Sequence, residues 1–206
     1  VYDNTGNSAS RISTSGAVSF KPSGSTYAID YSIQFEIEAG SFDFGKIENV
    51  NSATNDVTFL SDVTTQGGIT VSAQSIVISA GDDLVSTGNQ HSIFLKADSD
   101  ISAVNGSATT DAGHSRVQTN NGDIVFWADS DGDGTGGIRF GNYSQINSAN
   151  GSTSSAAISG GGDLIFAGGT STDSRGYPTG FAGRGTGSTD RSVQIAELTG
   201  LFTGGG

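Results

Sequence analysis

The chain has 206 residues, of which 32 are glycine, 2 are proline and none is cysteine, and its formal net charge is -12. The acidic surplus excludes a nucleic-acid binder, because neutralising phosphates requires a patch of Lys and Arg. No stretch approaches the roughly 18 apolar residues of a membrane span, and the recurring clusters of branched apolar and aromatic residues exclude a disordered chain.

Short runs of alternating polarity predict many strands and tight turns. In chain order, we expect strands at residues 17–20, 31–39, 41–47, 56–61, 68–73, 75–80, 83–87, 92–97, 116–119, 123–128, 137–141, 144–146, 163–168 and 192–198. Helical periodicity is not sustained anywhere, since glycines or Ser/Asn clusters interrupt every candidate window. The sequence therefore predicts an all-β protein.

Similar strand modules recur at unequal offsets. SIFLKADSD, which ends at Asp100, and DIVFWADSD, which ends at Asp131, are offset by 31 residues, whereas NGDIVF from Asn121 and GGDLIF from Gly161 are offset by 40. A constant strand core with loops of variable length is typical of a β-solenoid, in which successive coils stack and share one apolar interior. We expect coils of roughly 20 to 30 residues, about seven to ten in number.

Segments in the last third of the chain resemble a known family. GDIVFWADSDGDGTGGIRFGNYSQINSANG from Gly122, GGGDLIFAGG from Gly160 and the closing GGG resemble repeats of filamentous haemagglutinin-like bacterial adhesins. Tyr177, Gly180, Phe181 and Ala182 stand where those repeats carry a Tyr-x-x-Gly-Tyr/Phe-Ala insertion. The likeness covers about residues 120–206 well, 56–100 loosely and 1–40 hardly at all.

This resemblance implies a right-handed parallel β-helix with variable loops, used as a stalk or adhesin outside the cell or at the bacterial cell surface. We expect residues 1–40 to be an irregular or capping β segment. Residues 41–206 should form solenoid coils that continue beyond the C-terminus in a longer protein. The expected role is structural or adhesive and not enzymatic, with self-association through solenoid ends or edges.

Four aromatic residues near strand ends or in a long loop could contact glycans or surface proteins, or could pack onto the rod: Trp127, Tyr143, Tyr177 and Phe181. Aromatic rings suit both roles, since they stack on sugars and anchor interfaces. For Trp127, packing is favoured, because it follows Phe126 in a strand and one of the two must face inward.

One loop carries candidate metal ligands. Asp129, Asp131 and Asp133 alternate with other residues and lead into Gly134, as in the first half of an EF-type calcium loop. The twelfth position, where that loop needs a bidentate Glu, is Phe140. Calcium could still bind if Asp98, Asp100 or a carbonyl of a neighbouring coil contributed. A solvated turn is the favoured interpretation, because Asp and Gly suit its dihedral angles, and no cofactor is required.

Two other function classes remain open as alternatives. A polysaccharide-cleaving or carbohydrate-binding β-helix would use exposed carboxylates or a basic residue, and the candidates are Asp82, Asp83, Asp98, Asp100 and Arg139. An ice-binding or mineral-binding solenoid would need a regular Thr or Asp array, which the irregular TTQ and SATTD segments do not provide. The two histidines, His91 and His114, lack zinc-site spacing.

Overall fold

The computed structural model describes residues 10–21, 31–45, 56–104, 106, 113–150, 160–184 and 192–203. Every named element in these residues is a strand, and they form three sheets. No helix in this part of the chain has the length and apolar character needed to cross a membrane.

Seven strands form sheet A, in the spatial order β1 (Arg11–Ser13), β4 (Glu36–Ala39), β7 (Val63–Thr65), β10 (Asp83–Asn89), β13 (Ser115–Asn120), β16 (Ser144–Asn147) and β20 (Gly200–Phe202). Sheet B contains β2 (Ala17–Phe20), β5 (Ser41–Phe44), β8 (Ile69–Ala73), β11 (Ile93–Ala97), β14 (Ile124–Ala128), β17 (Leu164–Thr172) and β18 (Pro178–Gly180). Sheet C contains β3 (Tyr31–Ile33), β6 (Val57–Phe59), β9 (Ile76–Ile78), β12 (Ile101–Ala103), β15 (Ile138–Phe140) and β19 (Val193–Ile195).

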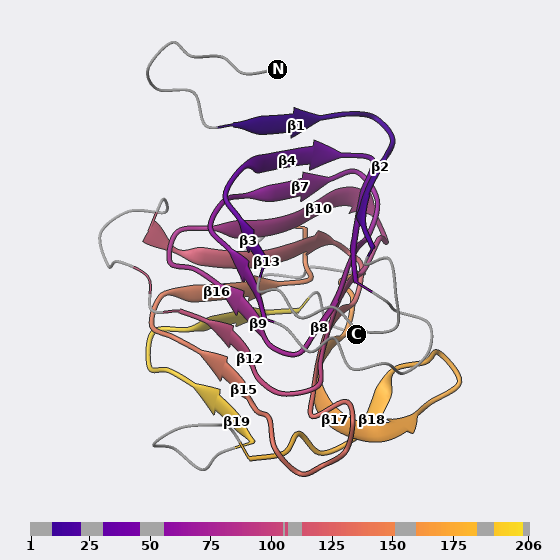
Figure 1. Cartoon of the computed structure of the whole chain (residues 1–206), viewed down its shortest axis with the longest axis vertical. Helices are drawn as coiled ribbons and strands as arrows, with labels where there is room; N and C mark the ends of the chain where they lie inside the picture. The colour runs from indigo at the N-terminus through magenta and orange to yellow at the C-terminus, as the bar shows by residue number, and fades with distance from the viewer. Residues whose placement is uncertain are drawn as a thin grey trace.

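The chain visits sheets A, B and C in turn, so that three consecutive strands complete one coil and each strand pairs with its counterpart in the next coil. Figure 1 shows this stack, with β1, β4, β7, β10, β13 and β16 lying one below another from the N-terminal end. All strand pairings are parallel except the one between β17 and β18. The prediction of an all-β parallel β-helix is confirmed.

The two sequence offsets correspond to neighbouring coils. Ile93 in β11 pairs with Ile124 in β14, an offset of 31, and Ile124 pairs with Leu164 in β17, an offset of 40. The unequal offsets arise because the strands keep their register while the loops between them differ in length.

The core is a column of apolar side chains along the stack. One inward row of sheet B runs through six coils and consists of Phe20, Phe44, Val71, Leu95, Phe126 and Phe166. The members inside the stack are at most 2% exposed, whereas the two end members, Phe20 and Phe166, are only partly buried. A single coil could not shelter these side chains, so the coils stabilise one another by stacking.

Buried hydroxyl groups close the corner between sheets A and B. Thr65 and Ser86 both donate hydrogen bonds to the carbonyl of Gly67, and Thr119 donates to the carbonyl of Gly122. These three side chains are at most 1% exposed. Because a buried polar group is costly only when it lacks a partner, the corner can be polar inside without destabilising the rod.

The described residues contain six complete sets of three strands, from β1 to β19, and β20 begins a seventh coil. This number lies at the low end of the expected seven to ten because the later coils are longer: Ile146 in β16 pairs directly with Leu201 in β20, 55 residues further on.

The described residues of segment 1–40 already belong to the solenoid. Ile12 of β1 pairs in register with Ile37 of β4, which pairs with Val63 of β7. Residues 1–9 and 22–30 of that segment lie outside the described part.

Candidate functional site

The three predicted metal ligands lie together in the loop after β14. One carboxylate oxygen from each of Asp129, Asp131 and Asp133 lies within 4.8 Å of the others, and within the described residues this is the one group of three potential metal ligands that comes together. Asp129 is 4% exposed, whereas Asp131 and Asp133 face the solvent. The spacing of the aspartates therefore does predict their proximity.

Backbone amides already occupy part of this oxygen cluster. The amide of Gly134 donates to Asp129 Oδ1 at 3.1 Å, and the amide of Thr135 donates to Asp133 Oδ1 at 2.7 Å. Burial raises the pKa of Asp129, partly offset by the Gly134 amide. The pKa of Asp133 is lowered by its hydrogen bonds with the Thr135 hydroxyl and amide.

Asp98 and Asp100 of the neighbouring coil accept hydrogen bonds from this same loop. Asp98 Oδ1 accepts a hydrogen bond from the Ser130 hydroxyl at 2.7 Å, and Asp100 Oδ1 accepts one from the Gly137 amide at 2.8 Å. Gly134 has a φ of +87°, which suits the sixth position of a calcium loop, but Phe140 at the twelfth position lies in the core at 1% exposure. The loop thus resembles half of such a site, and its internal hydrogen bonds define its shape.

Calcium removal should therefore leave the fold intact. We expect the same melting temperature in calcium and in excess chelator, because the amides of Gly134 and Thr135 hold the loop without an ion. Thermal unfolding followed by circular dichroism measures this. A calcium-dependent rise in melting temperature that disappears in Asp131→Asn/Asp133→Asn would contradict the expectation and establish a cation site on these carboxylates.

The predicted insertion packs onto the outside of sheet B. β17 turns away from the sheet near Gly169, which has a φ of +72°, and β18 returns antiparallel to it, so that the hairpin projects from the rod (Figure 1). The Tyr177 hydroxyl donates to Asp123 Oδ2 at 2.8 Å, and the Tyr177 ring lies 6.2 Å from that of Phe94. Tyr177 therefore fastens the hairpin to the rod.

Trp127 faces outward but lies beneath this hairpin. Its indole Nε1 donates to the carbonyl of Gly169 at 2.8 Å, and the ammonium of Lys96 lies 4.4 Å from the ring centroid. The side chain is 7% exposed, whereas its neighbour Phe126 faces the core at 0%. The expectation that one of the pair faces inward is confirmed, and Trp127 is not a free stacking surface.

Arg175 clamps the hairpin tip. Its guanidinium donates to Asp163 Oδ2 at 2.9 Å and to Asp173 Oδ2 at 3.1 Å, and it lies over the Tyr177 ring at 4.6 Å from the centroid. Exposed ion pairs contribute little individually, but this one side chain makes several contacts that fix a single loop geometry.

Arg175→Ala should loosen the hairpin without unfolding the coils. Trp127 is the sole tryptophan, so we expect its fluorescence to shift to longer wavelength and to become more accessible to acrylamide, while the melting temperature changes little. Arg139→Ala, an equal change on the exposed face of β15, is the matched control. Unchanged quenching in Arg175→Ala would show that the clamp does not hold the hairpin.

The remaining aromatic and histidine candidates lie apart. Phe181 is 93% exposed. Tyr143 stacks on His114 at 5.8 Å between ring centroids, with His114 Nδ1 2.8 Å from the Gln145 amide nitrogen, while His91 lies exposed at another corner. Of the residues considered for partner contact, Phe181 is the one whose ring is free.

The carboxylates considered for catalysis separate into two corners. Asp98 and Asp100 belong to the surroundings of the Asp129 loop. Asp82 directly precedes β10 and Asp83 is its first residue, and the Asp83 amide donates to Asp62 Oδ1 at 2.9 Å. Asp83 Oδ2 accepts a hydrogen bond from Arg116 Nε at 2.9 Å. Burial raises the pKa of Asp82 to about 6, and the charges of Asp62 and Asp83 add to that effect.

Asp82→Asn should stabilise the protein above pH 6 and have less effect near pH 4. A carboxyl whose folded-state pKa is raised contributes stability below its unfolded pKa, and that contribution is lost as pH rises through about 6. Since the side chain is only partly buried, solvent screening should keep the gain below about 1 kcal/mol. Urea unfolding at both pH values measures it, and an equal effect at the two would contradict the assignment.

Comparison with protein-family models, with curated proteins and with solved structures finds no match for this chain.

Proposed function

We propose that this chain is a rigid β-solenoid segment of a large secreted or cell-surface bacterial protein, acting as a structural or adhesive rod with a projecting hairpin. The observation that carries the proposal is the continuous in-register stacking of coils from β1 to β20 over one core. Such a stack resists bending because each coil is held to its neighbours by three parallel sheets.

The C-terminal end of the stack supports association through solenoid ends. Four apolar side chains in and between β19 and β20 are 37–50% exposed: Val193, Ile195, Leu198 and Leu201. Val193, Ile195 and Leu201 pair in register with the buried residues Ile138, Phe140 and Ile146. Another β coil stacked on these side chains, from the same protein or from a second copy, would cover them.

Sedimentation velocity over a wide concentration range tests this association. We expect oligomers to form with rising concentration and to be reduced by Leu198→Lys or Leu201→Lys, which place a charge on the open end. Leu60→Lys is the matched control. Leu60 is 43% exposed, but it directly follows β6, which is four strands away from β19 in sheet C. A monomer at all concentrations would contradict end-to-end association.

The ice-binding or mineral-binding alternative and the polysaccharide-cleaving alternative lack a comparable observation. An outward row of sheet B reads Ser19, Asp43, Thr70, Phe94, Val125 and Ile165, which is no regular Thr or Asp array. Polysaccharide cleavage would use some of the five candidates Asp82, Asp83, Asp98, Asp100 and Arg139, and we expect the chain to show no turnover of polysaccharide substrates.

A further inference from the structure

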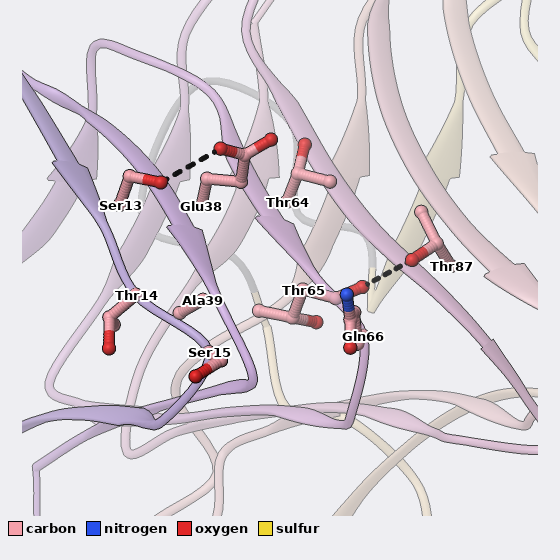
Figure 2. A pocket seen from close by; sticks show the side chains of 9 residues that line it. All are labelled: Ser13, Thr14, Ser15, Glu38, Ala39, Thr64, Thr65, Gln66 and Thr87. Carbon is pink, nitrogen blue, oxygen red and sulfur yellow. Dashed lines mark hydrogen bonds between the residues drawn. The ribbon is translucent and has the colours of Figure 1, made fainter.

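A polar groove lies on the outside of the rod, where the chain passes from sheet A to sheet B in the first four coils (Figure 2). Its volume is about 480 Å³, and nine residues from the ends of β1, β4 and β7 and from β10 line it. This volume falls within the usual range for small-molecule sites. The groove is separate from the Asp129 loop and from the hairpin, which belong to later coils.

Coil stacking brings the groove's polar groups into a row. Ser13 pairs in register with Glu38, and Glu38 pairs with Thr64, so that outward side chains of three coils stand side by side. Gln66 and Thr87 continue the wall at the corner (Figure 2). With neighbouring strands about 4.8 Å apart, three coils present this row over about 10 Å, which is about the length of two linked sugar rings.

Several walls of the groove are fixed by internal hydrogen bonds. The Ser13 hydroxyl donates to Glu38 Oε2 at 3.1 Å, and the Thr87 hydroxyl donates to the carbonyl of Thr65 at 2.8 Å. The buried Thr65 hydroxyl donates to the carbonyl of Gly67 at 2.6 Å. A site held in this way loses little conformational freedom when a ligand binds.

The groove's chemistry selects the class of ligand. Hydroxyl groups and the Gln66 amide both donate and accept hydrogen bonds, which suits the hydroxyls of a sugar. Glu38 is the one charged residue among the nine, and Arg11 forms an ion pair with it. One carboxylate is too few for calcium, a lining without cationic residues does not suit phosphate or sulfate, and a lining without large apolar residues does not suit a lipid.

We infer that this groove binds a neutral saccharide, with Thr64 and Gln66 as hydrogen-bonding residues on its wall. The inference gives a ligand to the rod proposed above, but it rests on the groove alone. Binding of a sugar and end-to-end association are therefore measured separately, and either can fail without the other.

Saturation-transfer NMR with cellobiose, chitobiose, lactose, maltose and mannobiose tests the inference. We expect at least one of these neutral disaccharides to bind the intact chain. Thr64→Val/Gln66→Leu, which keeps side-chain size but removes the hydrogen-bonding groups, should weaken binding roughly tenfold or more. The matched control is Thr70→Val/Gln74→Leu, in the same coil but outside the groove, and it should bind as the unchanged protein does.

Thermal unfolding of both double variants confirms that each is folded before binding is compared. Failure of all five disaccharides to bind would overturn the inference, and so would equal binding by the groove variant and the control variant. Preferential binding of an anionic saccharide such as galacturonic acid dimer would also overturn it, since the groove offers no cation for the carboxylate.

Discussion

Phe126→Ala should lower the free energy of unfolding by about 3 to 5 kcal/mol. Phe126 is fully buried, and its ring centroid lies 5.0 Å from that of Phe140 and 5.4 Å from that of Phe166. The substitution removes the ring contacts that join β14 to β17 in the next coil and to β15 in sheet C. The parallel stack cannot collapse into the resulting cavity without shifting several strands.

Phe181→Ala is the control for this measurement, because it is the same chemical change at a side chain that is 93% exposed. We expect its effect to stay within about 0.5 kcal/mol. Urea denaturation of the two variants and of the unchanged protein gives both values. Similar losses for Phe126→Ala and Phe181→Ala would mean that Phe126 does not lie in the core.

Gly122→Ala should destabilise the protein by about 3 kcal/mol, because the added methyl group would clash with the backbone of the neighbouring coil. A methyl group added at Gly122 would lie 2.0 Å from the carbonyl oxygen and 2.4 Å from the carbonyl carbon of His91, in the coil above. Backbone atoms cannot move aside as a flexible side chain can, so the two coils would have to separate locally and weaken the adjoining strand pairs.

Gly16→Ala is the matched control at the same corner of the first coil. There an added methyl group would approach nothing closer than 3.6 Å, to the Thr14 hydroxyl, which is ordinary contact. We expect Gly16→Ala to be neutral or slightly stabilising, since alanine restricts the unfolded chain more than glycine does. A loss of stability at Gly16 equal to that at Gly122 would argue against close stacking as the cause.

Strand identity was largely predictable, because alternation such as Ile69, Val71 and Ala73 directly reports one buried face. The strands that the sequence did not predict are short or atypical: β1, β7, β12, β18 and β20. Each has three residues, and β18 begins with Pro178. Length alone does not explain the misses, because β6, β9, β15 and β19 are equally short and lie within predicted strands. The predicted strand at 31–39 is two strands, β3 and β4, because the chain passes from sheet C to sheet A within it.

The Asp129 loop and the polar groove also differ in how far the sequence predicts them. Asp129, Asp131 and Asp133 are close in sequence, so their proximity could be inferred from local spacing. The groove could not be inferred, since Ser13, Glu38 and Thr64 come from separate coils whose register depends on loop lengths that follow no fixed period. Pairing between distant strands is decided by the packing of the whole stack.

The distance between spin labels at Thr58→Cys and Gln194→Cys tests the stacked solenoid most directly. Both residues belong to one outward row of sheet C, which runs through Thr58, Val77, Ser102, Arg139 and Gln194 in register. The chain contains no cysteine, so these two would be its sole labelled sites. Four strand spacings of about 4.8 Å predict a separation of about 19 Å between the two backbones, broadened by the label tethers. A mean distance more than about twice this value would contradict the parallel stacking of coils on which the proposed rod depends.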